Sequence, residues 1–158
     1  MTGTATDEST AASPTRTRTN AGRLAAIAAT LAGLLLINLV IYAIGRALGG
    51  AFTYQQNGST VRVDPAAITI MSLAPLATGL ALIAVLSRMW PAAIRVARIA
   101  APTLAVATIA VMTMPAGFDT TSTLALAAMH LATIPAALLA LSALPRRPGQ
   151  STHRALPR

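Results

Sequence analysis

The sequence predicts an all-α membrane protein, an up-down-up-down four-helix transmembrane bundle with a short extracytoplasmic β-hairpin between the first two helices. Hydrophobic residues make up 54% of the 158 residues and charged residues only 10%, whereas a soluble domain carries about 25% charged residues. The apolar residues gather in four long stretches, and most arginines lie outside them. This composition argues against a water-soluble monomer.

Each apolar stretch is long enough to cross a bilayer. The expected spans are residues 24–45, 66–87, 94–114 and 122–144, within a membrane domain over residues 23–144. A helix of about 20 residues rises roughly 30 Å, the thickness of the hydrocarbon core, and must satisfy its own backbone groups there. A cleaved signal peptide ending near Ala47 is the weaker alternative for the first stretch, since its apolar run exceeds the roughly 7–15 residues typical of such peptides.

Arginine placement predicts the orientation. All 12 basic residues are arginines, and ten of them would share one side with both tails and the connection between the second and third spans. The other side would hold Arg46 and Arg62. Because the side richer in arginine is normally cytoplasmic, we expect a multi-pass protein of the bacterial plasma membrane with both termini in the cytoplasm.

The two ends of the chain are expected to be tails. Residues 1–22 are rich in Thr, Ala and Ser, which predicts a disordered cytoplasmic tail. Residues 145–158 form a basic tail without aromatic residues, so nucleic-acid binding is not expected. The arginines expected to set the topology or to contact lipid are Arg88, Arg95, Arg98, Arg146 and Arg147.

The connection between the first two spans predicts the hairpin. Asn57-Gly58 is the preferred pair for a type I′ turn. That turn sets Tyr54 opposite Val61 and Phe52 opposite Val63, which pairs aromatic with β-branched side chains.

Two acidic residues are expected to cap helices. Asp64, followed by Pro65, suits the start of the second span, and Asp119 suits the start of the fourth. Both therefore have a structural role before any functional one.

Polar side chains inside the spans are the candidate site. Asn38 and His130 lie seven and eight residues inside the outer ends of their spans, a depth of about 10–12 Å. The matching depth predicts a hydrogen bond between them, direct or through water, with Thr133 and Thr78 near enough to join. Such a bond is commonly structural; the alternative is a protonatable or ligand-binding site.

Other features give little sign of chemistry. Pro75, Pro102 and Pro135 are expected to break three spans, either lining a cavity or as ordinary features of membrane helices. The chain has no cysteine, no carboxylate within the spans and no phosphate-binding glycine loop. We therefore expect no enzymatic activity, metal site or cofactor.

Two stretches resemble a known family. They are Asp119 to Pro135, with Met129-His130-Leu131 as its most specific part, and Leu73-Ala-Pro75-Leu-Ala-Thr-Gly79. They resemble an uncharacterised family of small actinobacterial four-helix membrane proteins, a domain of unknown function. The likeness covers roughly residues 23–144 and implies the fold and topology but no substrate or catalytic residue.

Three functions remain open from the sequence. The first is a non-enzymatic membrane protein that associates with lipid, a second copy or another membrane protein. The second is a small transporter or permease-like subunit that uses the site around Asn38 and His130. The third is a binder of lipid or another hydrophobic ligand.

Overall fold

The computed structural model describes residues 15–90 and 92–144, with side chains from Asn20 onward. Four of its helices are long and apolar enough to cross a membrane, with α3 counted together with its π-helical end. A two-stranded antiparallel sheet lies between α1 and α2. The elements in chain order are α1 (Thr15–Ala47), β1 (Thr53–Gln56), β2 (Ser59–Arg62), α2 (Pro65–Met89), α3 (Ala93–Thr108), η1 (Ile109–Thr113) and α4 (Thr120–Ala143).

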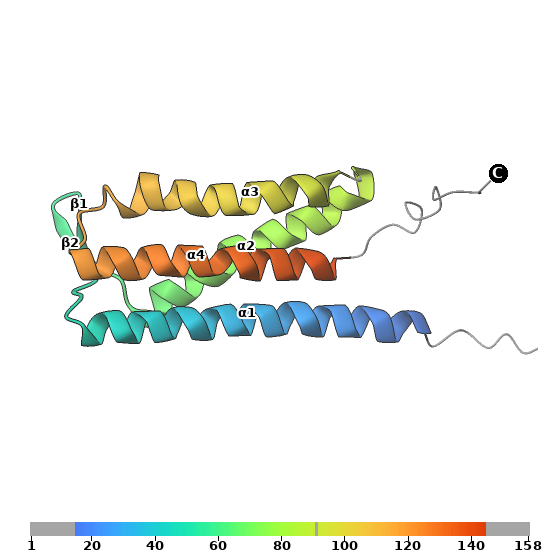
Figure 1. The fold of residues 1–158 in the computed structure, drawn as a ribbon, viewed down its shortest axis with the longest axis horizontal. Coiled ribbons are helices and arrows are strands. Elements are labelled where there is room, and N and C mark those ends of the chain that lie inside the picture. Colours follow the sequence, from blue (N-terminus) through green and yellow to red (C-terminus); the bar gives the residue numbers. More distant parts are fainter. Residues whose placement is uncertain (1–14, 91, 145–158) are drawn as a thin grey trace, which may run out of the picture.

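Helix α4 is the centre of the arrangement. It lies between α1 and α3, while α2 crosses behind them, and successive helices run in opposite directions (Figure 1). One third of the spanning segment of α4 is buried, against 11% for α1 and α2. We call the end with the strands and the starts of α2 and α4 the hairpin end, and the opposite end, with the α2–α3 connection, the basic end.

Small side chains let α3 and α4 approach each other near the basic end. Ala97 of α3 packs in one buried cluster with Ala140 and Leu141 of α4 and Leu80 of α2. Lipid provides no hydrophobic drive between helices, so close packing of small residues has to supply the contact. A second cluster near the hairpin end contains Phe52, Ile68, Ala125 and Met129.

The hairpin forms in the predicted register. Tyr54 pairs with Val61, and positive φ angles of 53° at Asn57 and 78° at Gly58 are those of the expected type I′ turn. Phe52 lies opposite Val63 as predicted, just before β1, and its carbonyl accepts a hydrogen bond from the Val63 amide at 2.8 Å. Its φ is 52° and its side chain is fully buried, in edge contact with Tyr42 at a centroid distance of 4.7 Å.

Both predicted caps are confirmed. The Asp64 side chain accepts a hydrogen bond from the Ala67 amide at 2.7 Å, with Pro65 in the first turn of α2. The Asp119 side chain accepts one from the Ser122 amide at 2.9 Å.

Two expectations about helix continuity are wrong. Helix α1 begins at Thr15, so residues 15–22 are helical rather than part of a disordered tail; extending an existing helix gains one hydrogen bond for each residue fixed. Pro75, Pro102 and Pro135 lie inside continuous helices instead of breaking them. Each proline removes one backbone hydrogen bond, and the remaining turns keep theirs. Residues 1–14 and the basic tail 145–158 lie outside the described residues.

Candidate functional site

Asn38 is fully enclosed between helices. It is 1% exposed, and its Nδ2 donates a hydrogen bond to the Ser72 hydroxyl of α2 at 2.8 Å. Its Oδ1 has no hydrogen-bond partner. Ser72 was missed from the sequence, although it lies seven residues after Pro65 and therefore about 10 Å along α2, at the depth of Asn38. The side chain joins α1 to α2 and leaves one acceptor unused.

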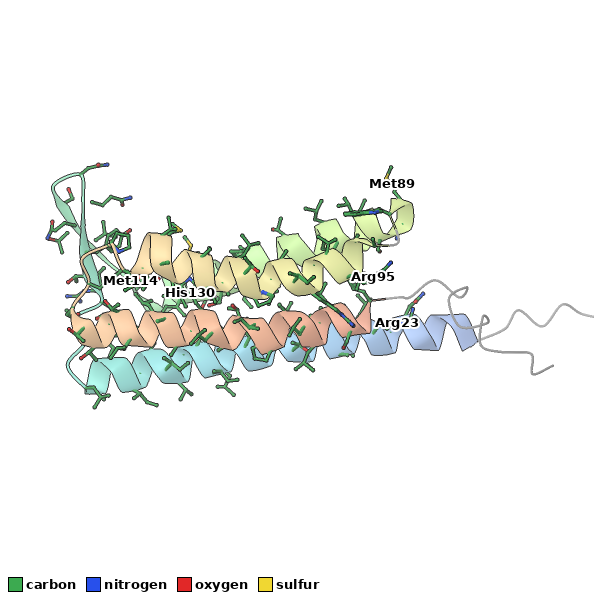
Figure 2. The ribbon with its side chains drawn as sticks, turned by 45° about the horizontal axis from the view of Figure 1, so that its top comes forward. Arg23, Met89, Arg95, Met114 and His130 are labelled. Carbon is green, nitrogen blue, oxygen red and sulfur yellow. The ribbon has the colours of Figure 1, made fainter. Side chains whose placement is uncertain are left out.

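His130 is half-buried in the half of α4 nearer the hairpin end (Figure 2). Its Nδ1 lies 2.8 Å from the Leu126 carbonyl oxygen, and the Thr133 hydroxyl donates to the His130 carbonyl at 2.5 Å. Both contacts stay within α4, and Thr78 is exposed on α2. The four predicted site residues therefore do not form one hydrogen-bonded group.

Asn38 and His130, predicted to share a hydrogen bond either directly or through water, form no direct hydrogen bond among the described residues. Met129 is one of the α4 residues in the buried cluster against which Leu39, Ile41 and Tyr42 of α1 pack. His130 lies one residue further, about 100° around the helix axis. Equal depth placed the two residues at one level of the bundle, but depth says nothing about the direction of a side chain.

A polar network at the hairpin end ties the loop after α1 to the start of α4. Asp119 Oδ2 accepts hydrogen bonds from the Ser122 hydroxyl at 2.5 Å and from the Ala51 amide at 3.0 Å. The Ser122 hydroxyl oxygen in turn accepts one from the Phe52 amide at 2.8 Å. These bonds, the Ser122 hydroxyl first and its amide second, lower the pKa of Asp119 from 3.8 to about 2.

Two glycines make room for this network. A Cβ on Gly45 would lie 2.8 Å from the Phe52 ring, and one on Gly50 would lie 2.9 Å from the Gly45 carbonyl oxygen. Arg46 closes the same loop, since its guanidinium donates to the carbonyls of Gly50 and Ala51 at 2.9 and 3.0 Å. The network holds the hairpin on the bundle. In the sequence, only the expected helix cap at Asp119 pointed to it.

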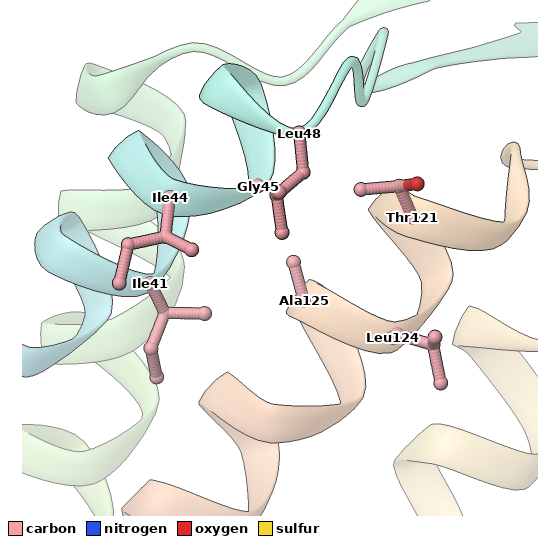
Figure 3. Close-up of a pocket in the computed structure, with 7 residues that line it drawn as sticks. All are labelled: Ile41, Ile44, Gly45, Leu48, Thr121, Leu124 and Ala125. Atoms are coloured by element: carbon pink, nitrogen blue, oxygen red, sulfur yellow. The ribbon is translucent and has the colours of Figure 1, made fainter.

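A shallow groove of about 260 Å³ lies between α1 and α4 near the hairpin end (Figure 3). The Thr121 hydroxyl is the one polar side-chain group in its lining. Such a surface suits a hydrocarbon chain and has no charge to hold a polar ligand. The lining residues are Ile41, Ile44, Gly45, Leu48, Thr121, Leu124 and Ala125.

The basic end collects positive charge. Arg23 of α1 and Arg95 of α3 lie at this end (Figure 2), as do Arg88 at the end of α2 and Arg98 in α3. The acidic residues of the described ranges, Asp64 and Asp119, cap helices at the hairpin end. Arg146 and Arg147 fall outside the described residues.

Metal ligands do not gather within residues 15–90 and 92–144. No group of three or more His, Cys, Asp or Glu in these ranges is placed to hold an ion. Met71, Met112 and Met114 are 73%, 67% and 68% exposed, so their thioethers point away from the bundle interior.

One comparison identifies the family. The model described as "Family of unknown function (DUF6069)" matches residues 14–149, which include all four helices and the hairpin. The chain belongs to this family. Membership of an uncharacterised family is thus confirmed, while an actinobacterial origin stays a prediction. No match to a curated protein or to a solved structure was found.

Proposed function

We propose that this DUF6069 family member is a non-enzymatic integral protein of the bacterial plasma membrane that acts by associating with other membrane components. The observation that carries the proposal is the amount of apolar surface left outside the bundle. Only 11% of the spanning segments of α1 and α2 is buried. Apolar surface on this scale marks a membrane or protein contact, and its partner is lipid, a second copy or another membrane protein.

The exposed side chains of α1 support this proposal. Most of them lie in the half of the helix nearer the hairpin end, and one lies near the opposite end. The large apolar side chains of α1 that are at least 48% exposed are Leu24, Leu36, Ile37, Val40 and Ile44. A partner can therefore lie alongside the half of α1 nearer the hairpin end.

The distribution of charge supports an orientation. Of the arginines with described side chains, four lie at the basic end and two at the hairpin end. By the positive-inside rule, the basic end and both termini face the cytoplasm and the hairpin faces outward, so the helices run up-down-up-down. The network around Asp119 then holds the loops on the outer surface.

The polar groups inside the spans favour association with membrane components over transport. Asn38 donates a hydrogen bond to Ser72, and the hydrogen bonds of His130 to other described residues stay within its own helix. The transporter alternative depends on a joint site of Asn38 and His130, and no direct hydrogen bond joins these two residues in the described part of the chain. Binding of a hydrophobic ligand stays second, because the apolar groove of Figure 3 suits an acyl chain.

Site-specific photo-crosslinking in the membrane tests the association. A photoreactive residue replaces Ile37, which is 51% exposed, or Leu34, three residues earlier and 2% exposed. We expect the Ile37 position to crosslink to lipid or to another polypeptide, and the Leu34 position to crosslink only within the chain. Equal yields of external product from both positions would contradict the proposal.

A further inference from the structure

We propose that the basic end binds the phosphate headgroups of anionic phospholipids through Arg23, Arg95 and Arg98. The inference rests on the proposed function for membrane insertion and deepens it by naming a class of partner. Guanidinium groups suit phosphate because their fixed donors match its oxygens in pairs.

The guanidinium groups of Arg23, Arg95 and Arg98 have no carboxylate near them within the described ranges. Asp64 and Asp119 lie at the opposite ends of α2 and α4, helices of 25 and 24 residues. They are thus roughly 25–36 Å away along the helix axes, nearest to Arg98, the sixth residue of α3. This distance exceeds the Debye length of about 8 Å at physiological salt. An anion that neutralises these arginines has to come from outside this part of the chain.

Two of the arginines share one side of α3. Arg95 is exposed and Arg98, three residues further, is half-buried, so both side chains can reach one headgroup region. The first turn of α3 contains no acidic residue, and Ala92 at its start makes no side-chain cap. The backbone charge at this helix end is therefore also positive and adds to that of the arginines.

Apolar side chains beside the arginines favour a lipid over free phosphate. Each of the three arginines is followed directly by an apolar residue with a large exposed fraction: Leu24 at 68%, Val96 at 47% and Ile99 at 72%. A phospholipid offers a phosphate and a hydrocarbon chain side by side, which matches this pairing. Inorganic phosphate would leave the apolar side chains without a contact.

Native mass spectrometry of the detergent-purified full chain tests the proposal, with phosphatidylglycerol and phosphatidylcholine as probes. We expect wild type to retain phosphatidylglycerol in preference to phosphatidylcholine. Arg95→Gln/Arg98→Gln should weaken phosphatidylglycerol binding by about 30-fold, roughly five-fold for each arginine, and leave phosphatidylcholine binding unchanged. Equal binding of phosphatidylglycerol by wild type and the double variant would overturn the proposal.

A matched control separates local binding from net charge. Arg98→Gln and Arg62→Gln each remove one positive charge, the second from strand β2 at the hairpin end, and only the first should weaken phosphatidylglycerol binding. Equal losses in both would contradict a site at the basic end. Displacement of phosphatidylglycerol by millimolar inorganic phosphate would reassign the site to free phosphate.

A measurement on wild type covers the case in which the double variant does not fold. Added salt should weaken phosphatidylglycerol binding, because it screens arginine–phosphate attraction, and salt-independent binding would overturn the proposal. Binding in micelles does not depend on orientation. A negative result here would therefore not bear on the proposed topology or on the crosslinking at Ile37, which are tested independently.

Discussion

The side-chain amide of Asn38 in α1 donates to the hydroxyl of Ser72 in α2 across 2.8 Å, while its carbonyl oxygen has no partner. This is a side-chain hydrogen bond between two spanning helices, and it lies in an enclosed part of the bundle. In membranes such bonds contribute about 0.6 kcal/mol on average and up to about 2. The main effect of the pair is therefore to fix the position of α1 relative to α2, and its contribution to the free energy of unfolding is small.

Removing one partner of this pair should cost more than removing both. We expect Ser72→Ala to destabilise the protein by about 1–2 kcal/mol, because it leaves the Asn38 amide group buried without a partner. Asn38→Leu in the same background should recover part of that loss. Unfolding of the two single variants and the double variant in detergent measures the coupling, and additive effects would show that the bond contributes nothing.

Packing around the Phe52 ring predicts a steric effect at Gly45. Gly45→Ala places a Cβ at 2.8 Å from the Phe52 ring and should destabilise by about 1–3 kcal/mol through overpacking. Gly33→Ala is the matched control, since a Cβ there meets nothing within 4 Å. The control should stabilise by up to about 1 kcal/mol through helix propensity. Thermal melts compare the two, and a harmless Gly45→Ala would contradict the tight approach.

The Asp119 network predicts a dependence of stability on acid. Its folded pKa of about 2 lies below the ordinary 3.8, so the ionised carboxylate stabilises the fold above pH 3.8. This contribution is lost as pH falls from 3.8 toward 2, because the unfolded state then binds the proton more readily. The difference in Tm between wild type and Asp119→Asn should be constant at pH 5–7 and shrink on acidification. A difference that grows with acid would refute this role.

The local contacts of His130 predict a small effect of its removal. Its Nδ1 contacts the Leu126 carbonyl of its own helix, so His130→Leu should change stability by less than about 1 kcal/mol. Native mass spectrometry of the same variant separates the alternatives. A small molecule that is bound by wild type and lost in the folded variant would restore the ligand-binding interpretation.

Composition and local patterns predicted the helices, the turn and both caps because these depend on near neighbours in the chain. Asn57-Gly58 specifies a type I′ turn wherever it occurs between two strands, and Asp64-Pro65 starts a helix by its own geometry. The pairing of Asn38 with Ser72 depends on how the two helices are rotated about their axes. The depth of a residue in its span does not give this rotation. The burial of Phe52 likewise depends on space left by Gly45, seven residues away in the chain.

Labelling of single cysteines in intact bacterial cells tests the central claim most directly, since the chain has no cysteine of its own. Ser59→Cys places a thiol in the hairpin, and Met89→Cys places one at the basic end, where Met89 is 85% exposed. A membrane-impermeant maleimide should label Ser59→Cys in intact cells and Met89→Cys only after lysis. Labelling of Met89→Cys in intact cells with Ser59→Cys protected would contradict the orientation, and labelling of both would contradict a membrane-spanning bundle.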